Sequence, residues 1–161
     1  MHGVVIRDAR VPDELSIVRA LFEEYAASLD VDLCFQDFDR ELAGLPGDYG
    51  APRGCLLVAH DGTNAIGCVA LRPLAGDDSR AGEVKRLYLR PDARGSGAGR
   101  ALAVAVIGRA RAAGYRTLKL DTLASMRAAR TLYASLGFRA CDAYYQNPLP
   151  GVMYMALELD E

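Results

Sequence analysis

The chain has 161 residues, 51% of them hydrophobic and 25% charged, with a formal net charge of −2. This composition is that of one globular domain, residues 1–161, with enough chain to bury a core. The sequence has no apolar run long enough to span a bilayer and no signal-peptide pattern at its N-terminus, so we expect a cytoplasmic protein without a membrane partner.

The first half of the chain predicts a strand, two helices and a pair of strands. Residues 4–9 are typical of a short strand. Apolar side chains at helical spacing predict a helix over 12–27, with Pro12 at its start. A shorter helix is expected over 38–45. Residues 55–74 predict two strands joined by a tight Asp-Gly turn.

The second half alternates strands with helices. Glycines follow both expected helices, and Ser125 has the residue type and position of an N-cap. The expected elements are strands over 83–91, 117–122, 138–144 and 152–159, and helices over 98–113 and 126–136.

The order of these elements predicts the fold class. It reads β-α-α-β-β-β-α-β-α-β-β, so a meander of strands leads into alternating strands and helices. We therefore expect an α/β fold of the α+β type. Its mixed, mostly antiparallel sheet would have about 6–7 strands, flanked by about 4 helices.

Basic residues gather in the middle of the sequence. Residues 1–81 hold 7 basic and 14 acidic side chains, residues 82–130 hold 11 and 3, and residues 131–161 hold 1 and 4. The middle block is either a solvated basic face or a site for a polyanion. Because the whole chain is acidic and no basic stretch is interleaved with aromatics, a small phosphorylated ligand is favoured over nucleic acid.

The cysteines argue against a disulfide framework and against zinc. Cys34, Cys55, Cys68 and Cys141 are scattered without CxxC spacing, and only two histidines are present. The pattern is typical of reduced thiols. We expect no metal.

A glycine-rich stretch opens the helix expected from residue 98. It reads Arg94-Gly95-Ser96-Gly97-Ala98-Gly99-Arg100. Glycines at a helix N-terminus let backbone N–H groups approach an anion, which the helix dipole and the flanking arginines also favour. The stretch predicts a phosphate or pyrophosphate site. The alternative is a tight turn with incidental arginines.

Two familiar phosphate loops match this stretch less well. A Walker loop needs Lys-Ser or Lys-Thr after the last glycine, and Arg100 stands there instead. A dinucleotide fingerprint places Arg100 where Gly or Ala is wanted, although Asp121 imitates the ribose-binding acid. The dinucleotide interpretation remains the second choice.

A third interpretation fits best. The stretch matches (Arg/Gln)-x-x-Gly-x-(Gly/Ala), and with "VKRLYLRPDARG" before it resembles motif A of the GNAT superfamily of acetyl-CoA-dependent N-acetyltransferases. "ARTLYASLGF" resembles the family's motif B, and the expected element order also matches. The resemblance implies the GNAT fold over nearly the entire chain.

The resemblance also implies cofactor contacts with acetyl-CoA as co-substrate. Backbone N–H groups of the glycine stretch would bind the pyrophosphate of coenzyme A, and the preceding strand would carry the pantetheine arm. Carried over, the cofactor-binding residues are Leu87, Tyr88, Leu89, Arg94, Gly95, Ser96, Gly97, Ala98, Gly99 and Arg100.

Further residues acquire roles from the resemblance. Tyr133 occupies the place of the hydroxyl that assists the departing thiolate, against the alternative that it only packs on a helix face. Glu83 lies about where family members place a base or a water-positioning carboxylate, or is a surface acid. Met126 replaces the Asn that often begins motif B, so a contact of that Asn is missing or replaced. Candidate acceptor-binding residues are Arg86, Tyr145 and Asn147, and weaker candidates for proton transfer are Asp121 and Tyr144. Lys85 and Arg86 would attract an acidic substrate group or stabilise Glu83.

The predicted function is transfer of acetyl from acetyl-CoA to a primary amine of a small molecule, by direct attack in a ternary complex. Two alternatives stay open: an acyl-CoA sensor without turnover, and a dinucleotide-dependent oxidoreductase. The sequence also allows a homodimer.

Overall fold

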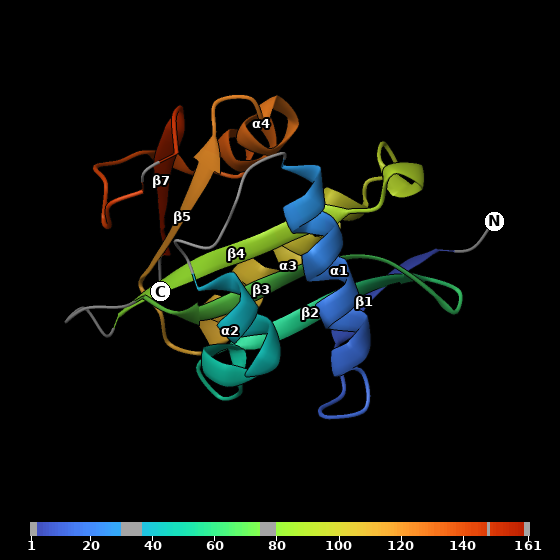
Figure 1. Cartoon of the computed structure of the whole chain (residues 1–161). Helices are drawn as coiled ribbons and strands as arrows, with labels where there is room; N and C mark the ends of the chain where they lie inside the picture. The colour runs from blue at the N-terminus through green and yellow to red at the C-terminus, as the bar shows by residue number, and fades with distance from the viewer. Residues whose placement is uncertain (1–2, 30–36, 75–79, 148, 160–161) are drawn as a thin grey trace.

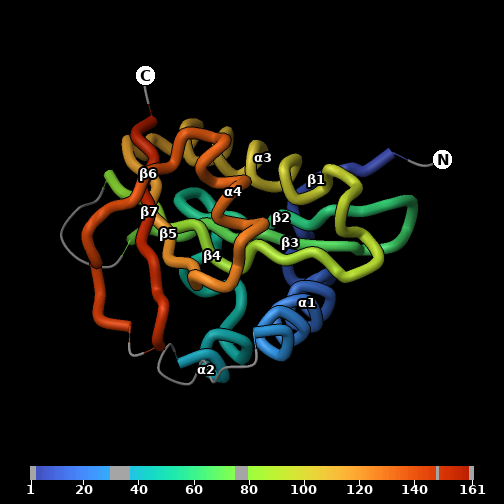
Figure 2. The backbone as a smooth tube through the Cα atoms, turned by 90° about the horizontal axis from the view of Figure 1, so that it is seen from above, coloured from blue at the N-terminus to red at the C-terminus, as the bar shows by residue number. Residues whose placement is uncertain are grey.

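The computed structural model describes residues 3–29, 37–74, 80–147 and 149–159, which form one sheet between two layers of helices (Figures 1 and 2). The 7-stranded sheet has the order β1-β2-β3-β4-β5-β7-β6. Its strands are β1 (Val4–Asp8), β2 (Cys55–Asp61), β3 (Asn64–Pro73), β4 (Ala81–Leu89), β5 (Thr117–Leu123), β6 (Arg139–Ala140) and β7 (Val152–Glu158). Its helices are α1 (Leu15–Ser28), α2 (Phe38–Ala43), α3 (Ala98–Ala112) and α4 (Arg127–Ser135), with short 3-10 turns at Gly47–Tyr49 and Pro91–Ala93. The mixed, mostly antiparallel fold class is confirmed, since β4 and β5 are parallel and the other neighbouring strands antiparallel.

Each face of the sheet carries its own hydrophobic core. Figure 2 shows α3 and α4 on one face and α1 and α2 on the other. On the first face, Leu102 and Val106 of α3 pack against alternate side chains of the central strands. On the second face, Leu21 and Phe22 of α1 pack against the intervening side chains. Strand alternation therefore decides which layer each residue of β4 and β5 faces.

Four predicted boundaries differ from the structure. Helix α1 begins at Leu15 rather than Pro12, because the Glu14 carboxylate accepts the Arg10 N–H at 2.8 Å and holds the preceding residues in a turn. Ser125 is not the N-cap of α4. Met126 takes that position, and no side chain caps the helix.

The expected strand over 138–144 is also too long, since β6 contains only Arg139 and Ala140. Beyond it, the Tyr144 and Tyr145 hydroxyls bond to carboxylates on β4 and β5, and the segment contacts β7 through side chains rather than through a strand ladder. Helix α2 likewise ends at Ala43, before the expected residue 45.

The thiol prediction is confirmed where the structure describes it. Cys55, Cys68 and Cys141 are free cysteines. Cys34 lies outside the described residues. In the described part of the chain, no helix is long and apolar enough to cross a membrane.

Strands β4 and β5 run together only at their starts. Their pairing joins Ala81–Glu83 to Thr117–Lys119, and no described residue pairs them further along. The β3–β4 register shifts where Cys68 and Ala70 oppose Tyr88 and Lys85, which places an extra residue in β4. Arg86, inside this bulge, has φ of 61°, in the left-handed region. A bulge bends its strand, so β4 turns away from β5 and a cleft opens between them.

Candidate active site

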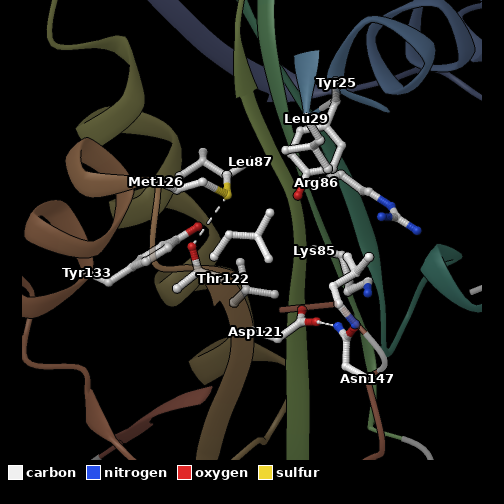
Figure 3. A pocket seen from close by; sticks show the side chains of 13 residues that line it. Tyr25, Leu29, Lys85, Arg86, Leu87, Asp121, Thr122, Met126, Tyr133 and Asn147 are labelled. Atoms are coloured by element: carbon white, nitrogen blue, oxygen red, sulfur yellow. Dashed lines mark hydrogen bonds between the residues drawn. The ribbon is translucent and has the colours of Figure 1, made fainter. Parts of the chain in front are cut away.

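The cleft between β4 and β5 is a pocket that passes through the sheet. Its walls come from α1, β4, β5, α4 and the segment before β7 (Figure 3). The lining residues are Tyr25, Leu29, Val84, Lys85, Arg86, Leu87, Asp121, Thr122, Leu123, Met126, Tyr133, Asn147 and Leu149. Figure 3 shows Tyr133, Met126 and Thr122 at one end and Lys85, Asp121 and Asn147 at the other. The two ends therefore offer different chemistry.

The glycine stretch lies at the N-terminus of α3, on the Tyr133 side of the sheet. Gly95 and Gly97 have φ of 82° and 88°, so both need the left-handed conformation that glycine adopts freely. Gly97 is the N-cap of α3, and no side chain caps this helix. Within the described ranges, the N–H groups of Gly97, Gly99 and Arg100 have no acceptor. Three N–H donors at a helix start match the requirements of a phosphate or pyrophosphate.

The residues around this loop are held by its own hydrogen bonds. Ser96 Oγ accepts the Ala98 N–H at 3.3 Å, which closes the turn. Arg94 Nε donates to the Leu89 carbonyl at 3.3 Å. Arg100 Nη1 donates to Ser135 Oγ on α4 at 3.1 Å. Both guanidinium groups therefore lie beside the loop, in the exposed positions expected of residues that add positive charge to it.

The open edge of β4 leads from this loop into the pocket. Leu87 lines the pocket, and Leu89 lies under Gly99. The Tyr88 side chain points to the opposite face, where its hydroxyl donates to Glu24 on α1 at 3.3 Å. On the edge that faces β5, pairing ends at Glu83, so the later backbone groups of β4 are available to an extended ligand.

Tyr133 is buried at the same end of the pocket. Its ring packs edge-on against Phe138, with centroids 5.5 Å apart, and its hydroxyl points into the pocket (Figure 3). Tyr133 therefore does both: its ring packs in the core and its hydroxyl reaches the pocket. Burial raises the pKa of the Tyr133 hydroxyl, as do the neighbouring Tyr25 and Asp121. The group is a protonated donor at neutral pH.

Met126 fills the place of the usual motif-B Asn with a thioether. Its sulfur accepts a hydrogen bond from Thr122 Oγ1 at 3.6 Å, and both residues line the pocket near Tyr133. A weak acceptor thus stands where the family pattern has an amide.

Glu83 is buried, with an exposed fraction of 3%, so the surface-acid alternative is wrong. Its Oε1 accepts Arg72 Nε at 2.9 Å and its Oε2 accepts the Tyr144 hydroxyl at 2.8 Å. It does not line the pocket. Both carboxylate oxygens are therefore engaged with protein groups, at the point where β4 and β5 still pair.

Arg86 points away from the pocket centre, toward α2. Its Nε and Nη2 donate to both oxygens of Glu41, at 3.1 and 2.9 Å, and its guanidinium lies over the Phe38 ring at 5.1 Å. The guanidinium is thus occupied in a buried bidentate pair. It holds α2 against the bulge of β4 and supports the left-handed conformation there.

Tyr145 and Asn147 meet at Asp121. The Tyr145 hydroxyl and Asn147 Nδ2 both donate to Asp121 Oδ2, the latter at 3.1 Å, and Asn147 Nδ2 also lies 2.9 Å from the Tyr145 oxygen. No donor to Oδ1 is found among the described residues. The two predicted acceptor-binding residues therefore orient a carboxylate that lines the pocket.

Lys85 lies on the opposite wall from Asp121. It is buried in the lining, with an exposed fraction of 4%. Burial lowers the pKa of its ammonium, the negative charges of Glu83 and Asp121 act against that shift, and Arg86 adds to it. The acceptor end of the pocket thus combines a cation and an anion.

Sequence reasoning missed the residues that fix this end. Arg72 anchors Glu83, and Glu41 anchors Arg86. Tyr144, named above only as a candidate for proton transfer, instead ties the segment before β7 to Glu83. Two of these contacts join elements distant in sequence: Arg86 and Glu41 are 45 residues apart, and Glu83 and Tyr144 are 61 apart. No local sequence pattern predicts a contact between residues so far apart in the chain. The signal available was strand alternation, since in "EVKRLY" it places Lys85 on the same face of its strand as Glu83.

Comparison with known proteins agrees with this geometry. The model of the Acetyltransferase (GNAT) family matches residues 17–138. A Schizosaccharomyces pombe protein named as an uncharacterized N-acetyltransferase is 41% identical over 161 residues, covering 99% of this chain and 97% of that protein. The N-acetylaspartate synthetase of Rattus norvegicus is 35% identical over 122 residues, covering 75% of this chain and 39% of that protein. The structure of a Salmonella typhimurium acetyltransferase with its cofactor acetyl-CoA has a TM-score of 0.74 at 23% identity, covering 99% of this chain and 95% of that one.

The fold and its split sheet define an acyltransferase. The chain belongs to the acetyltransferase (GNAT) family, because the family model covers most of it and a full-length relative shares two-fifths of its residues. The predicted enzyme class is confirmed. The dinucleotide-dependent oxidoreductase is wrong, since its doubly wound parallel sheet is not the sheet found here.

Proposed function

We propose that the protein transfers the acetyl group of acetyl-CoA to the primary amine of a small molecule, by direct attack while both are bound. The observation that carries this proposal is the set of N–H donors on Gly97, Gly99 and Arg100, next to the open edge of β4 and on the same side of the sheet as Tyr133. Acetyl-CoA supplies the activated acyl group.

The residues of the loop and of β4 divide the cofactor between them. The loop N–H groups bind the pyrophosphate, and Arg94 and Arg100 add positive charge at its exposed rim. The β4 edge from Leu87 to Leu89 pairs with the amides of the pantetheine arm as an added strand would. The bend of β4 at its bulge directs that arm into the pocket.

Tyr133 stabilises the leaving group. A thiol resembling cysteine has a pKa of about 8.5 and a tyrosine about 10, so complete transfer of the tyrosine proton to the thiolate is unfavourable by roughly 2 kcal/mol. Burial widens that difference by raising the pKa of Tyr133. Tyr133 therefore donates a hydrogen bond that strengthens as negative charge develops on sulfur, and its contribution belongs to turnover rather than binding.

The acceptor amine enters from the α1 and α2 face. Asp121 lines the pocket there, with Oδ2 oriented by Tyr145 and Asn147, and receives the amine proton directly or through water. Glu83 as the base stays a prediction. Its bonds to Arg72 and Tyr144 favour a positioning role, in which it fixes the width of the cleft. A small acceptor is supported by the relative whose name gives an N-acetylated amino acid as product.

Two measurements test the proposal. Calorimetric titration with acetyl-CoA, and with a nicotinamide dinucleotide as the control ligand, should give binding to acetyl-CoA alone. A screen of amines that follows free thiol should then find an acceptor that accelerates thiol release. Binding of acetyl-CoA without turnover on any amine would support the sensor alternative. Absence of binding would overturn the assignment of the loop.

A further inference from the structure

Arg86 holds a backbone conformation that residues with a side chain rarely adopt. Its φ of 61° lies in the left-handed region, and it stands where β4 carries the extra residue of its bulge. A bulge whose first residue is left-handed normally has glycine there, because a Cβ makes this conformation unfavourable. Interactions of the Arg86 side chain therefore have to offset that cost.

The Arg86 side chain is held by contacts with α1 and α2. Its guanidinium donates to both Glu41 oxygens, at 3.1 and 2.9 Å, and lies over the rings of Phe38 and Tyr25, at 5.1 and 5.8 Å. The side chains of Arg86 and Glu41 are 2% and 10% exposed, so solvent screens the pair only weakly. Figure 3 shows the Arg86 side chain on the opposite side of β4 from Tyr133. These contacts therefore fix the bulge from the α1 and α2 face of the sheet.

The bulge decides where the backbone of β4 points beyond it. Arg86 falls outside the β3–β4 register, and its carbonyl accepts the Cys68 S–H at 3.3 Å. Pairing with β3 resumes at Tyr88. Leu87, between them, is the first residue of the edge proposed above to pair with the pantetheine arm. A change of φ at Arg86 would therefore rotate this edge relative to the glycine loop.

We infer that Glu41 is a positioning residue for acetyl transfer, which acts through Arg86 to keep the bulge of β4 in the conformation that directs the pantetheine arm into the pocket. The inference rests on the proposed function and adds a residue of α2 to it. Glu41 does not line the pocket, so its effect passes through Arg86. The carboxylate holds the guanidinium, the guanidinium holds the left-handed φ, and the bent strand presents its edge to the arm.

Two substitutions at Arg86 separate the backbone conformation from the guanidinium. Arg86→Gly and Arg86→Ala both remove the pair with Glu41, but only glycine takes a φ of 61° freely. The left-handed conformation is disfavoured for alanine by about 5- to 30-fold in an equilibrium constant. In calorimetric titrations, we therefore expect Arg86→Ala to weaken acetyl-CoA binding by about that factor and Arg86→Gly to stay within about threefold of the parent. Equal affinities of the two variants would overturn the inference.

The variant Glu41→Gln tests the role of the carboxylate. It leaves the guanidinium buried without its counter-charge, so acetyl-CoA binding should weaken by about the same 5- to 30-fold factor. In the Arg86→Gly background, which has no buried guanidinium, the same substitution should change the affinity by less than about twofold. Asp39→Asn, on the exposed side of α2, is the matched control and should have no effect. A loss of equal size in both backgrounds, or no loss in either, would contradict the inference.

A ligand without the pantetheine arm separates this effect from a general loss of the fold. 3′-Phospho-ADP, the nucleotide half of coenzyme A, reaches only the glycine loop, whose N–H groups these substitutions leave in place. Arg86→Ala and Glu41→Gln should therefore bind 3′-phospho-ADP within about twofold of the parent. If they lose affinity for it as strongly as for acetyl-CoA, the inference is wrong while the proposed function stands. If the parent binds neither ligand, the proposed function fails, and the inference with it.

Discussion

The two ends of the pocket are built in different ways. The cofactor end uses backbone groups of one continuous segment, residues 94–100, and the edge of the strand before it. The acceptor end uses side chains from α1, β4, β5 and the segment before β7. A backbone site suits a ligand that never changes, because it depends on conformation more than on side-chain identity. A side-chain site allows the acceptor to vary while the fold stays the same.

The largest loss of acetyl-CoA affinity is expected from a negative charge placed on the glycine loop. Gly97→Asp places a carboxylate where the pyrophosphate would bind. Two like charges about 4 Å apart near a surface repel by about 4 kcal/mol, so we expect acetyl-CoA affinity to fall by more than about 100-fold. Calorimetry measures this directly.

Two controls separate charge from backbone strain in that experiment. Gly97→Ala adds a Cβ at φ of 88° without any charge, and no described atom lies within 4 Å of that Cβ. Gly108→Asp adds the same charge in the exposed middle of α3. Gly108→Asp should stay within a few-fold of the parent, and Gly97→Ala, which carries only the strain of its φ, should lose less affinity than Gly97→Asp. Parental binding by Gly97→Asp would contradict the assignment of the loop.

The same contrast explains what sequence reasoning could recover. The glycine loop and the helix it opens were predictable because a turn, its φ angles and the following helix depend on adjacent residues. Tyr133 was found through its motif. The partners of Glu83 and Arg86 were not predictable, because they are set by which strands and helices the topology brings together.

Tyr133→Phe tests whether the Tyr133 hydroxyl takes part in the reaction where the two ends of the pocket meet. The variant keeps the ring contact with Phe138 and removes only the hydroxyl. We expect kcat to fall by about 100-fold, within the 10- to 1000-fold range that hydrogen-bond and general acid assistance contribute, with acetyl-CoA affinity nearly unchanged. Tyr49→Phe is the matched control, because it removes a buried hydroxyl that has no hydrogen-bond partner in the described part of the chain. Parental turnover in Tyr133→Phe, with chemistry rate-limiting, would return Tyr133 to a packing role.

At the acceptor end, the variants Asp121→Asn and Glu83→Gln separate two roles. One is accepting the proton of the acceptor amine, and the other is fixing the width of the cleft. An alkylamine has a pKa of about 10.4, so it needs help to lose its proton at neutral pH. We expect Asp121→Asn to lower kcat/KM by about 10- to 100-fold at neutral pH, with a loss that shrinks as the pH approaches the pKa of the amine. Glu83→Gln should lower it by less than about threefold, independently of pH. Rate profiles against pH, measured on the best acceptor, give both results. A pH-dependent loss confined to Glu83→Gln would instead assign the base to Glu83.

The smallest functional effect is expected from a carboxylate that belongs to neither end. Glu14 accepts hydrogen bonds from Arg7 Nη1 and the Arg10 N–H, each at 2.8 Å, and these bonds lower its pKa from 4.5 to about 2. Because the pKa is lower in the folded state, the stabilisation is complete above about pH 5 and is lost as the pH falls toward 2. Glu14→Gln should therefore reduce the free energy of unfolding at pH 7 by about 1 kcal/mol or less, since the Arg7 side chain is 40% exposed and solvent screens the pair.

Urea unfolding measures this effect. The difference in unfolding free energy between Glu14→Gln and the parent should shrink at pH 3. Glu23→Gln, on the exposed face of α1, is the control and should show no such pH-dependent difference. Neither variant should change KM or kcat at neutral pH. A Glu14→Gln curve that stays parallel to the parent's from pH 7 to 3 would contradict the lowered pKa. A loss of activity at unchanged stability would show that the start of α1 is part of the acceptor end.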